Sequence, residues 1–169
     1  MKAEQRWLTD EEQVLWRLML QAARKVSRVM EDTLLCSAQL STSEYAVLVA
    51  LSEAEGESLR LRDLCTELDW DRSRTSHQIT RMERRELVSK EKSPGDARGV
   101  LVRLTETGRD ALYRAVPDHV ESVRRVVFDH LNTEDIPALE RFFQGVMDVE
   151  NVPGGKRQVP DGPVELTSG

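Results

Sequence analysis

The stretch that decides the fold is residues 71–105, with the sequence DRSRTSHQITRMERRELVSKEKSPGDARGVLVRLT. Asp71 is a good N-cap, because its carboxylate can accept hydrogen bonds from the free N–H groups of a first helical turn. Thr75, Ile79, Met82 and Leu87 recur at helical spacing, so they are expected to face inward. The second half reads as two short strands, at residues 87–92 and 100–104, around a turn that contains Pro94 and Gly95. The stretch therefore predicts a helix followed by a β-hairpin.

The outward face of this helix is predicted to carry small polar and basic side chains, namely Arg72, Ser73, Arg74, Ser76, His77, Gln78 and Arg81. Arginine, glutamine and serine are side chains that bond to base edges and phosphates. A merely solvated helix face is the alternative. The charge distribution favours the first interpretation. Residues 60–103 hold 11 Lys/Arg against 8 Asp/Glu, whereas the whole chain holds 24 against 30 and is acidic. A basic segment in an acidic protein indicates a local footprint for a polyanion.

The hairpin is expected to have strands at residues 87–92 and 100–104, with a basic tip between them. A helix followed by such a hairpin is the plan of a winged helix-turn-helix. In that plan the helix enters the DNA major groove and the hairpin reaches the backbone or the minor groove. Lys92, Asp96 and Arg98 therefore join the predicted DNA contacts, with Asp96 holding the Arg98 guanidinium in a bidentate pair.

The run from Asp96 to Gly108, DARGVLVRLTETG, resembles the wing signature of the MarR family of transcriptional regulators, D-x-R followed by L-T-x-x-G. The preceding Leu64, Leu68 and residues 71–76 also look like that family's helix-turn-helix. The resemblance covers roughly residues 10–150, with specific motifs between 40 and 108. It implies a mainly α fold with a small β wing and an intertwined dimer. Glu86 departs from the family, in which glycine commonly follows the recognition helix.

The flanking segments are predicted to be helical. Thr9 and Glu12 form a capping box that opens a helix to about residue 36, and Ser41 and Glu44 form a second one. The first helix is apolar over more surface than one neighbour can cover, which favours burial against both its own domain and a partner subunit. A central helix of a monomer is the alternative. In the family, the short segment 58–60 is the strand that pairs with the wing.

The expected organisation has three parts. Residues 10–36 and 105–150 make a helical dimerisation region, with Pro117 expected to kink the helix that Thr105 caps. Residues 37–104 make the winged helix-turn-helix lobe. Residues 151–169 hold 4 Gly and 3 Pro and little to bury, so they are expected to be a disordered tail.

Composition argues against several classes of protein. No apolar run approaches the ~18–20 residues that span a membrane, and the N-terminus lacks the apolar core of a signal peptide. Cys36 and Cys65 are expected to be small buried hydrophobes in a cytoplasmic protein. His77, His119 and His130 lack metal-site spacing, and no phosphate loop or nucleophile elbow is present. We expect no enzyme activity, no cofactor, no metal and no membrane.

The sequence thus predicts a sequence-specific transcriptional regulator that binds double-stranded DNA as a homodimer on a pseudo-palindromic operator, most simply a ligand-responsive repressor. The resemblance also implies a small aromatic effector between the dimer helices and the DNA lobe. Trp16, Met19 and Tyr45, beside the cationic Arg17, are the predicted pocket for an aromatic anion. Two alternatives remain: an all-helical dimeric interaction module without DNA binding, and a regulator that senses oxidants through cysteine.

Overall fold

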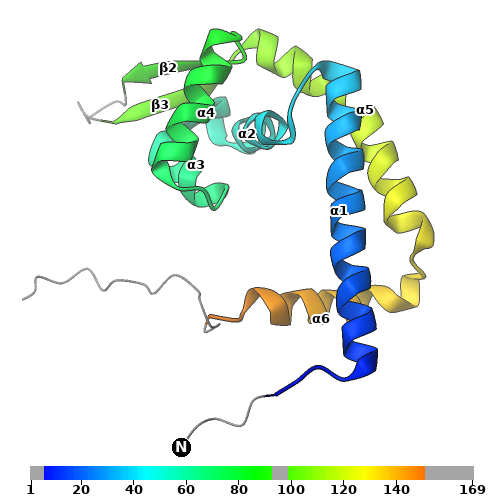
Figure 1. Ribbon diagram of the computed structural model, residues 1–169. Coiled ribbons are helices and arrows are strands. Elements are labelled where there is room, and N and C mark those ends of the chain that lie inside the picture. The colour runs from blue at the N-terminus through cyan, green and yellow to red at the C-terminus, as the bar shows by residue number, and fades with distance from the viewer. Residues whose placement is uncertain (1–5, 93–98, 151–169) are drawn as a thin grey trace, which may run out of the picture. The chain divides into compact units, whose positions relative to one another are not determined.

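A computed structural model describes residues 6–92 and 99–150 of the 169-residue chain (Figure 1). The chain divides into two compact units, Met1–His130 and Leu131–Gly169, which are described separately. The expected fold class, mainly α with a small β wing, is confirmed. The first unit contains α1 (Asp10–Ala38), α2 (Thr42–Glu53), η1 (Glu55–Glu57), β1 (Ser58–Arg60), α3 (Leu61–Glu67), α4 (Arg72–Arg84), β2 (Val88–Lys92), β3 (Val100–Leu104), α5 (Glu106–Val126) and η2 (Phe128–His130).

The helices α1, α2 and α4 begin where their capping residues predict. Both capping boxes are complete: Thr9 pairs with Glu12 at the start of α1, and Ser41 pairs with Glu44 at the start of α2. The Asp71 carboxylate accepts from the backbone N–H of Arg74 at 2.8 Å and opens α4. Local hydrogen bonds of this kind satisfy N–H groups that a helix leaves unpaired at its first turn. For that reason the starts are more predictable than the ends, and α1 runs two residues beyond the predicted position 36.

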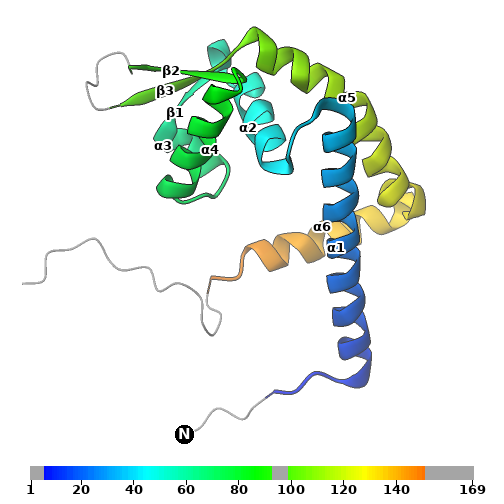
Figure 2. The ribbon, with the colours of Figure 1, turned by 45° about the horizontal axis from the view of Figure 1, so that its top comes forward.

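The three strands form one antiparallel sheet in the order β1-β3-β2 (Figure 2). In the central strand, Val102 lies opposite Leu59 of β1 on one side and Lys90 of β2 on the other. The predicted pairing of segment 58–60 with the wing is therefore confirmed. β3, in the middle of the sheet, contributes buried Val102 and Leu104 to the core.

The core of the first unit lies in the lobe formed by α2, α3, α4 and the sheet, and it extends to the neighbouring ends of α1 and α5. Its most deeply buried side chains are Leu34, Leu40, Val47, Leu48, Leu51, Leu64, Thr75, Ile79, Met82, Val88 and Val102. Thr75, Ile79, Met82 and Leu87 all face inward, as their spacing predicts. This inward stripe fixes which side of α4 is left for solvent.

The end of α4 is held by a left-handed residue. Glu86 has φ 58°, the N–H of Leu87 donates to the Met82 carbonyl at 3.0 Å, and the N–H of Glu86 donates to the Glu83 carbonyl at 2.9 Å. These two bonds define a Schellman ending, which usually has glycine at the left-handed position. The family's turn is thus kept although the residue differs, at a cost of about 1 kcal/mol for a side chain in this conformation.

The L-T-x-x-G motif fastens α5 to the same turn. The Thr105 hydroxyl donates to the Glu86 carbonyl at 2.6 Å and accepts from the Gly108 N–H at 3.0 Å. A Cβ at Gly108 would overlap the Leu87 carbonyl oxygen, at a separation that no side chain tolerates. Glycine is needed here because the first turn of α5 packs directly on the backbone that leaves α4.

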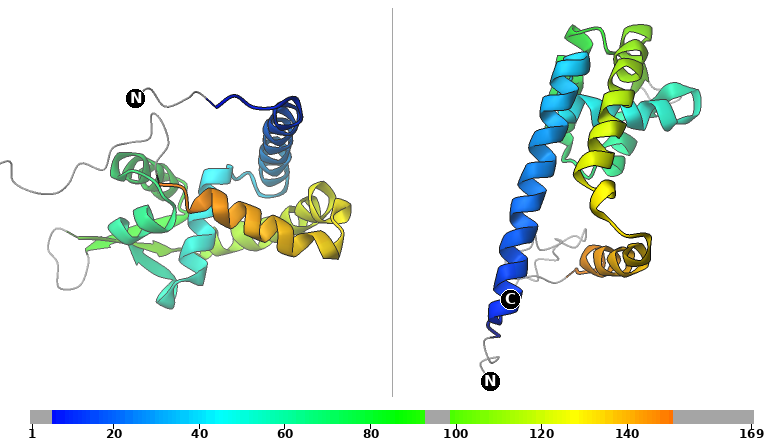
Figure 3. Two further views of the ribbon diagram at one scale, coloured as in Figure 1. Left: turned by 90° about the horizontal axis from the view of Figure 1, so that it is seen from below. Right: turned by 90° about the vertical axis from the view of Figure 1, so that its right-hand side faces the viewer.

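Beyond the lobe, α5 runs beside the C-terminal half of α1 (Figure 1; Figure 3). A hydrogen bond of 2.9 Å between the Thr33 and Ser122 hydroxyls ties the two helices together. Pro117 lies inside α5, as predicted. The N-terminal half of α1 is different, because its large apolar side chains are exposed; they are Val14, Leu15, Trp16, Leu18 and Leu20.

The second unit, Leu131–Gly169, contains η3 (Thr133–Asp135) and α6 (Ile136–Met147) among its described residues. α6 buries none of its side chains, although Leu139, Phe142, Phe143, Val146 and Met147 are all large and apolar. The expected tail at 151–169 lies outside the described residues. Among the residues described, no single helix is both long enough and apolar enough to cross a membrane, and α1 and α2 pass that test only as a pair bent by 74°.

Candidate nucleic-acid interface

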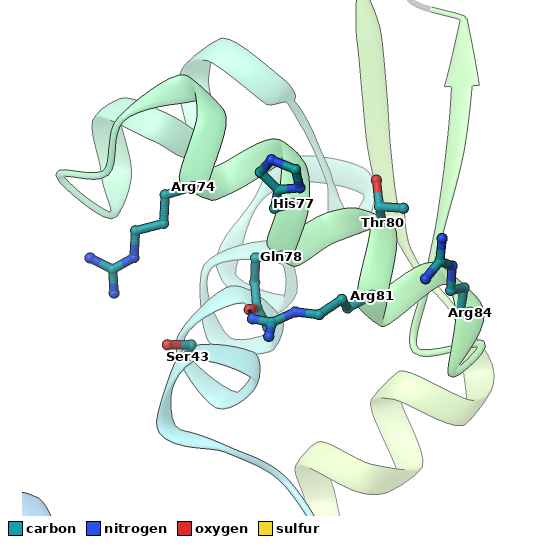
Figure 4. Close-up of a pocket in the computed structure, with 7 residues that line it drawn as sticks. All are labelled: Ser43, Arg74, His77, Gln78, Thr80, Arg81 and Arg84. Carbon is teal, nitrogen blue, oxygen red and sulfur yellow. Dashed lines mark hydrogen bonds between the residues drawn. The ribbon is translucent and has the colours of Figure 1, made fainter.

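The exposed side of α4 forms a shallow cationic hollow, which we call the recognition face. It encloses about 450 Å³ and is lined by Ser43 from α2 and by Arg74, His77, Gln78, Thr80, Arg81 and Arg84 from α4 (Figure 4). Three guanidinium groups therefore gather on one helix face. Arginine offers fixed N–H donors that match phosphates and the acceptor edge of guanine. The arrangement can bind a polyanion and distinguish bases along it.

Most of the α4 side chains that the sequence predicts to contact DNA lie on its exposed side. Arg72, Ser73, Arg74, Ser76, His77 and Arg81 are exposed. Sequence reasoning missed Ser43, Thr80 and Arg84. Arg84 could have been found by the same reasoning, since it follows Arg81 by three residues and so shares its helix face. Ser43 comes from another helix, and no local signal could have found it.

Gln78 corrects the prediction. The sequence predicts an outward side chain, but its exposed fraction is only 3%, and its side-chain oxygen accepts from the Arg81 guanidinium. The physical reason is its position beside the inward stripe, one residue before Ile79, where the start of α2 covers it. Gln78 thus lines the hollow beside Arg81 and orients its guanidinium in this conformation (Figure 4).

Arg74 is held by an aromatic ring. Its guanidinium carbon lies 4.2 Å from the ring centroid of Trp70, in the turn before α4. The Trp70 ring is partly buried, packs against the core and also supports the arginine. A cation stacked on an aromatic face loses less side-chain freedom when it then binds a ligand.

The C-terminal end of α4 is anchored to the corner between α1 and α2. Arg85 donates to the Glu44 carboxylate at 2.6 Å and to the Gln39 carbonyl at 2.8 Å. The other oxygen of Glu44 accepts from the Ser41 N–H at 2.9 Å, and the Glu44 side chain is only 8% exposed. A buried carboxylate with all these partners fixes the direction of α4 relative to the long helix.

The wing is braced against α4 at its base. Lys90 on β2 forms an ion pair of 2.7 Å with Glu83, and Arg103 on β3 forms one of 3.2 Å with Glu91. Lys92, a predicted DNA contact, is exposed at the end of β2. Asp96 and Arg98, the predicted contacts of the tip, lie outside the described residues.

A second hollow, the junction pocket, lies where α1, α2 and α5 meet beside the end of α3. It encloses about 460 Å³, and Met30, Leu34, Tyr45, Val49 and His119 are among the residues that line it. Of the four residues predicted for an effector, only Tyr45 is there. Trp16, Arg17 and Met19 lie more than two helical turns of α1 before Met30, and Trp16 and Arg17 are exposed. The predicted set is not brought together within this chain, because Tyr45 faces the other half of α1.

The cysteines also differ from expectation. Cys36 is exposed, although the sequence predicts a small buried residue, because it lies on the outer side of α1 between buried Leu34 and Ala38. Cys65 is partly buried. Within residues 6–92 and 99–150, no group of three or more His, Cys, Asp and Glu side chains is arranged to hold a metal ion.

Comparisons with known proteins agree on one kind of molecule. A family model for the transcriptional regulator SarA/Rot matches residues 31–114. AbsC, a MarR family transcriptional regulator from Streptomyces coelicolor, is 40% identical over 85% of this chain and 96% of its own, with a TM-score of 0.80. Sco3205, a MarR family regulator from the same organism solved in complex with DNA, is 36% identical over 86% and 91%, with a TM-score of 0.82.

The fold is also shared more widely. BpsR of Bordetella bronchiseptica, whose DNA binding is regulated by 6-hydroxynicotinic acid, is 24% identical over 86% of this chain and 100% of its own, with a TM-score of 0.72. No curated protein sequence matches the chain.

Proposed function

This chain belongs to the MarR family of winged helix-turn-helix transcriptional regulators, and from that premise we propose that it binds a pseudo-palindromic operator as a homodimer and represses transcription until a small ligand releases it. The observation that carries the proposal is the recognition face. Three arginines and a histidine gather on the exposed side of α4 in a chain whose net charge is −6. That concentration of positive charge is the feature expected of a helix that enters the major groove.

Each part of the face has its own role in the proposal. Arg74, stacked on Trp70, and Arg81, held by Gln78, are pre-organised to reach base edges. Arg72 and Arg84 lie at the two ends of α4, where they are suited to phosphates. Lys92 and the wing tip, with Arg98 and its partner Asp96, are proposed to follow the backbone into the minor groove. The lobe at residues 37–104 is therefore the proposed DNA-reading part.

Dimerisation is proposed for residues 10–36 and 105–150. Leu15 and Leu18 on α1 are 55% and 59% exposed, and Phe143 on α6 is 56% exposed. Helix faces that leave such large apolar side chains uncovered indicate a partner. A second copy is the simplest occupant, because an operator with twofold symmetry needs two recognition helices about 34 Å apart, one turn of DNA.

Ligand response is proposed for the junction pocket. It lies where the dimer helices α1 and α5 meet α2 of the lobe, so a molecule bound there can favour one separation of the two recognition helices. Release of DNA requires that the ligand bind the incompetent separation better. A tenfold preference at each of two sites lowers operator occupancy about a hundredfold.

The test begins with selection of bound fragments from random DNA, followed by affinity measurements on the selected site over a range of salt concentrations. A pseudo-palindrome with half-sites one helical turn apart is the expected result. Arg98→Ala should weaken binding by about 1–3 kcal/mol without changing the dimer, and Arg74→Ala should also alter which bases are selected. Arg62→Ala is the control, since Arg62 is an exposed arginine of α3 away from the recognition face.

Two outcomes would overturn the proposal. Selection that yields no enriched sequence would favour the alternative of a dimeric interaction module. An equal loss of affinity in Arg62→Ala and Arg74→Ala would show that only net charge, and not the recognition face, binds DNA. Repression itself is tested by a reporter behind the selected site, whose expression should rise when the gene for this chain is deleted.

A further inference from the structure

The junction pocket has a charge that the family resemblance does not suggest. Its polar rim carries two carboxylates, Glu53 at the end of α2 and Glu67 at the end of α3. None of the described residues that line it is lysine or arginine. Neither Glu53 nor Glu67 forms an ion pair with any residue that the structure describes. An apolar hollow with two uncompensated negative charges at its edge attracts cations and repels anions.

A neighbouring hollow does not offset the negative charge of the junction pocket. It shares Tyr45, Val49 and Glu53 with the junction pocket and does contain an arginine, Arg109. That arginine is already paired with both oxygens of Glu57. The pairing lowers the pKa of the Glu57 carboxyl, chiefly through the hydrogen bond from Arg109. Arg109 is thus neutralised locally, and Glu53 remains the unbalanced charge between the two hollows.

The lining of the pocket also includes a histidine and a tyrosine whose rings are in contact. The His119 ring contacts the Tyr45 ring, with 4.5 Å between centroids, and its Nδ1 is buried without a hydrogen-bond partner among the described residues. Burial lowers the pKa of His119, which favours the uncharged form of the ring over a cation that would offset the two carboxylates. Burial, and next the Glu53 carboxylate, raise the pKa of Tyr45.

We propose that the junction pocket selects a flat apolar ligand that carries a positive charge, such as an aromatic amine or amidine, and rejects aromatic carboxylates. This inference rests on the ligand response proposed above and gives its chemical class. The rings would lie against Met30, Leu34 and Val49, and the charged nitrogen would face Glu53 and Glu67. The aromatic anion expected from Arg17 does not fit, because Arg17 is not in the pocket.

The experiment compares three molecules of one shape and different charge: 2-naphthylmethylammonium, 2-naphthamide and 2-naphthoate. Their affinities for the full chain are measured by titration calorimetry at fixed pH and salt. The ammonium should bind at least about tenfold more tightly than the carboxylate, a difference of about 1.4 kcal/mol, with the amide between them. Tighter or equal binding of the carboxylate would overturn the proposal, and so would the absence of binding by all three at millimolar concentration.

Matched variants locate the effect. In the double variant Glu53→Gln and Glu67→Gln the shape is kept and the charge is removed, so the preference for the ammonium should fall towards one. Glu55→Gln is the control, because Glu55 is an exposed carboxylate next to α2 that does not line the pocket. A preference unchanged in the double variant would place the charge selectivity elsewhere and overturn the assignment.

The inference about the ligand and the proposed regulatory function can be contradicted independently of each other. Operator affinity is measured with and without the ammonium at saturation. Binding that leaves operator affinity unchanged would remove ligand response from the proposed function while the charge preference stands. Normal operator binding together with preference for the carboxylate would overturn only the inference about the ligand.

Discussion

The lobe around α4 and the N-terminal half of α1 differ in whether their large apolar side chains are buried. In the lobe, α2, α3, α4 and the sheet bury a continuous core, and each turn between them is closed by hydrogen bonds from its own residues. In the first half of α1, Leu15 and Leu18 are more than half exposed. One region covers its large apolar side chains within a single chain, and the other leaves them exposed. In the function proposed above, the first region reads DNA and the second holds two copies together, so each can be altered without the other.

The largest effect should come from removing the exposed leucines. In Leu15→Ser with Leu18→Ser, the isolated subunit loses little, since both side chains are already exposed. A dimer that buries them loses about 3 kcal/mol or more, roughly a hundredfold in its dissociation constant. Sedimentation equilibrium measures the change. Arg24→Ser, on the other side of the same helix, is the control. An unchanged dissociation constant would place the dimer interface elsewhere.

Gly108→Ala should damage the lobe instead. The added methyl would overlap the Leu87 carbonyl oxygen and lie 3.0 Å from Leu104 Cδ1, so α5 must shift. Overpacking of this kind costs about 1–3 kcal/mol, seen as a lower melting temperature. Gly145→Ala in α6 is the matched control, because no atom lies within 4 Å of the new methyl and alanine is the better helix former. Equal melting temperatures for the two variants would contradict the close approach at Gly108.

Two adjacent arginines, Arg84 and Arg85, test whether the contact that anchors the end of α4 to the corner between α1 and α2 is separate from DNA binding. Arg85→Ala leaves the buried Glu44 without its cation and should lower the free energy of unfolding by about 1–2 kcal/mol. Arg84→Ala should change unfolding by less than about 0.5 kcal/mol, since Arg84 is exposed, but should weaken DNA binding. Urea denaturation and operator titration separate the two. If Arg84→Ala proved the less stable variant, the anchoring role of Arg85 would be wrong.

The smallest change is Glu86→Gly. It relieves the left-handed conformation at φ 58° while keeping both hydrogen bonds of the Schellman ending. The gain is partly offset by the greater freedom of glycine in the unfolded chain, so we expect stabilisation by about 0.5 kcal/mol. Thermal unfolding should show a slightly raised melting temperature. A clear fall would mean that the Glu86 side chain makes a stabilising interaction of its own.

Features that depend on near neighbours along the chain could be predicted from the amino-acid sequence. Asp71 and Thr105 start their helices, Thr75, Ile79 and Met82 form the inward stripe, and the L-T-x-x-G motif predicts a wing followed by α5. Each of these acts over three or four residues, within reach of a capping bond or one helical turn. The exposed arginines of α4 follow from the same stripe. Much of the recognition face is therefore predictable from local patterns alone.

Features that depend on residues far apart in the chain required the tertiary structure. Arg85 and Glu44 are 41 residues apart, and Glu53, Glu67 and His119 come from three helices. Gln78 is buried because α2 covers that flank of α4, which no pattern within α4 can reveal. Spacing along a helix fixes which side is apolar, but burial of a flanking polar residue and the charge of a pocket depend on which other helix packs there. That is why the position of the recognition face could be predicted from the sequence, whereas the sign of the charge at the junction pocket could not.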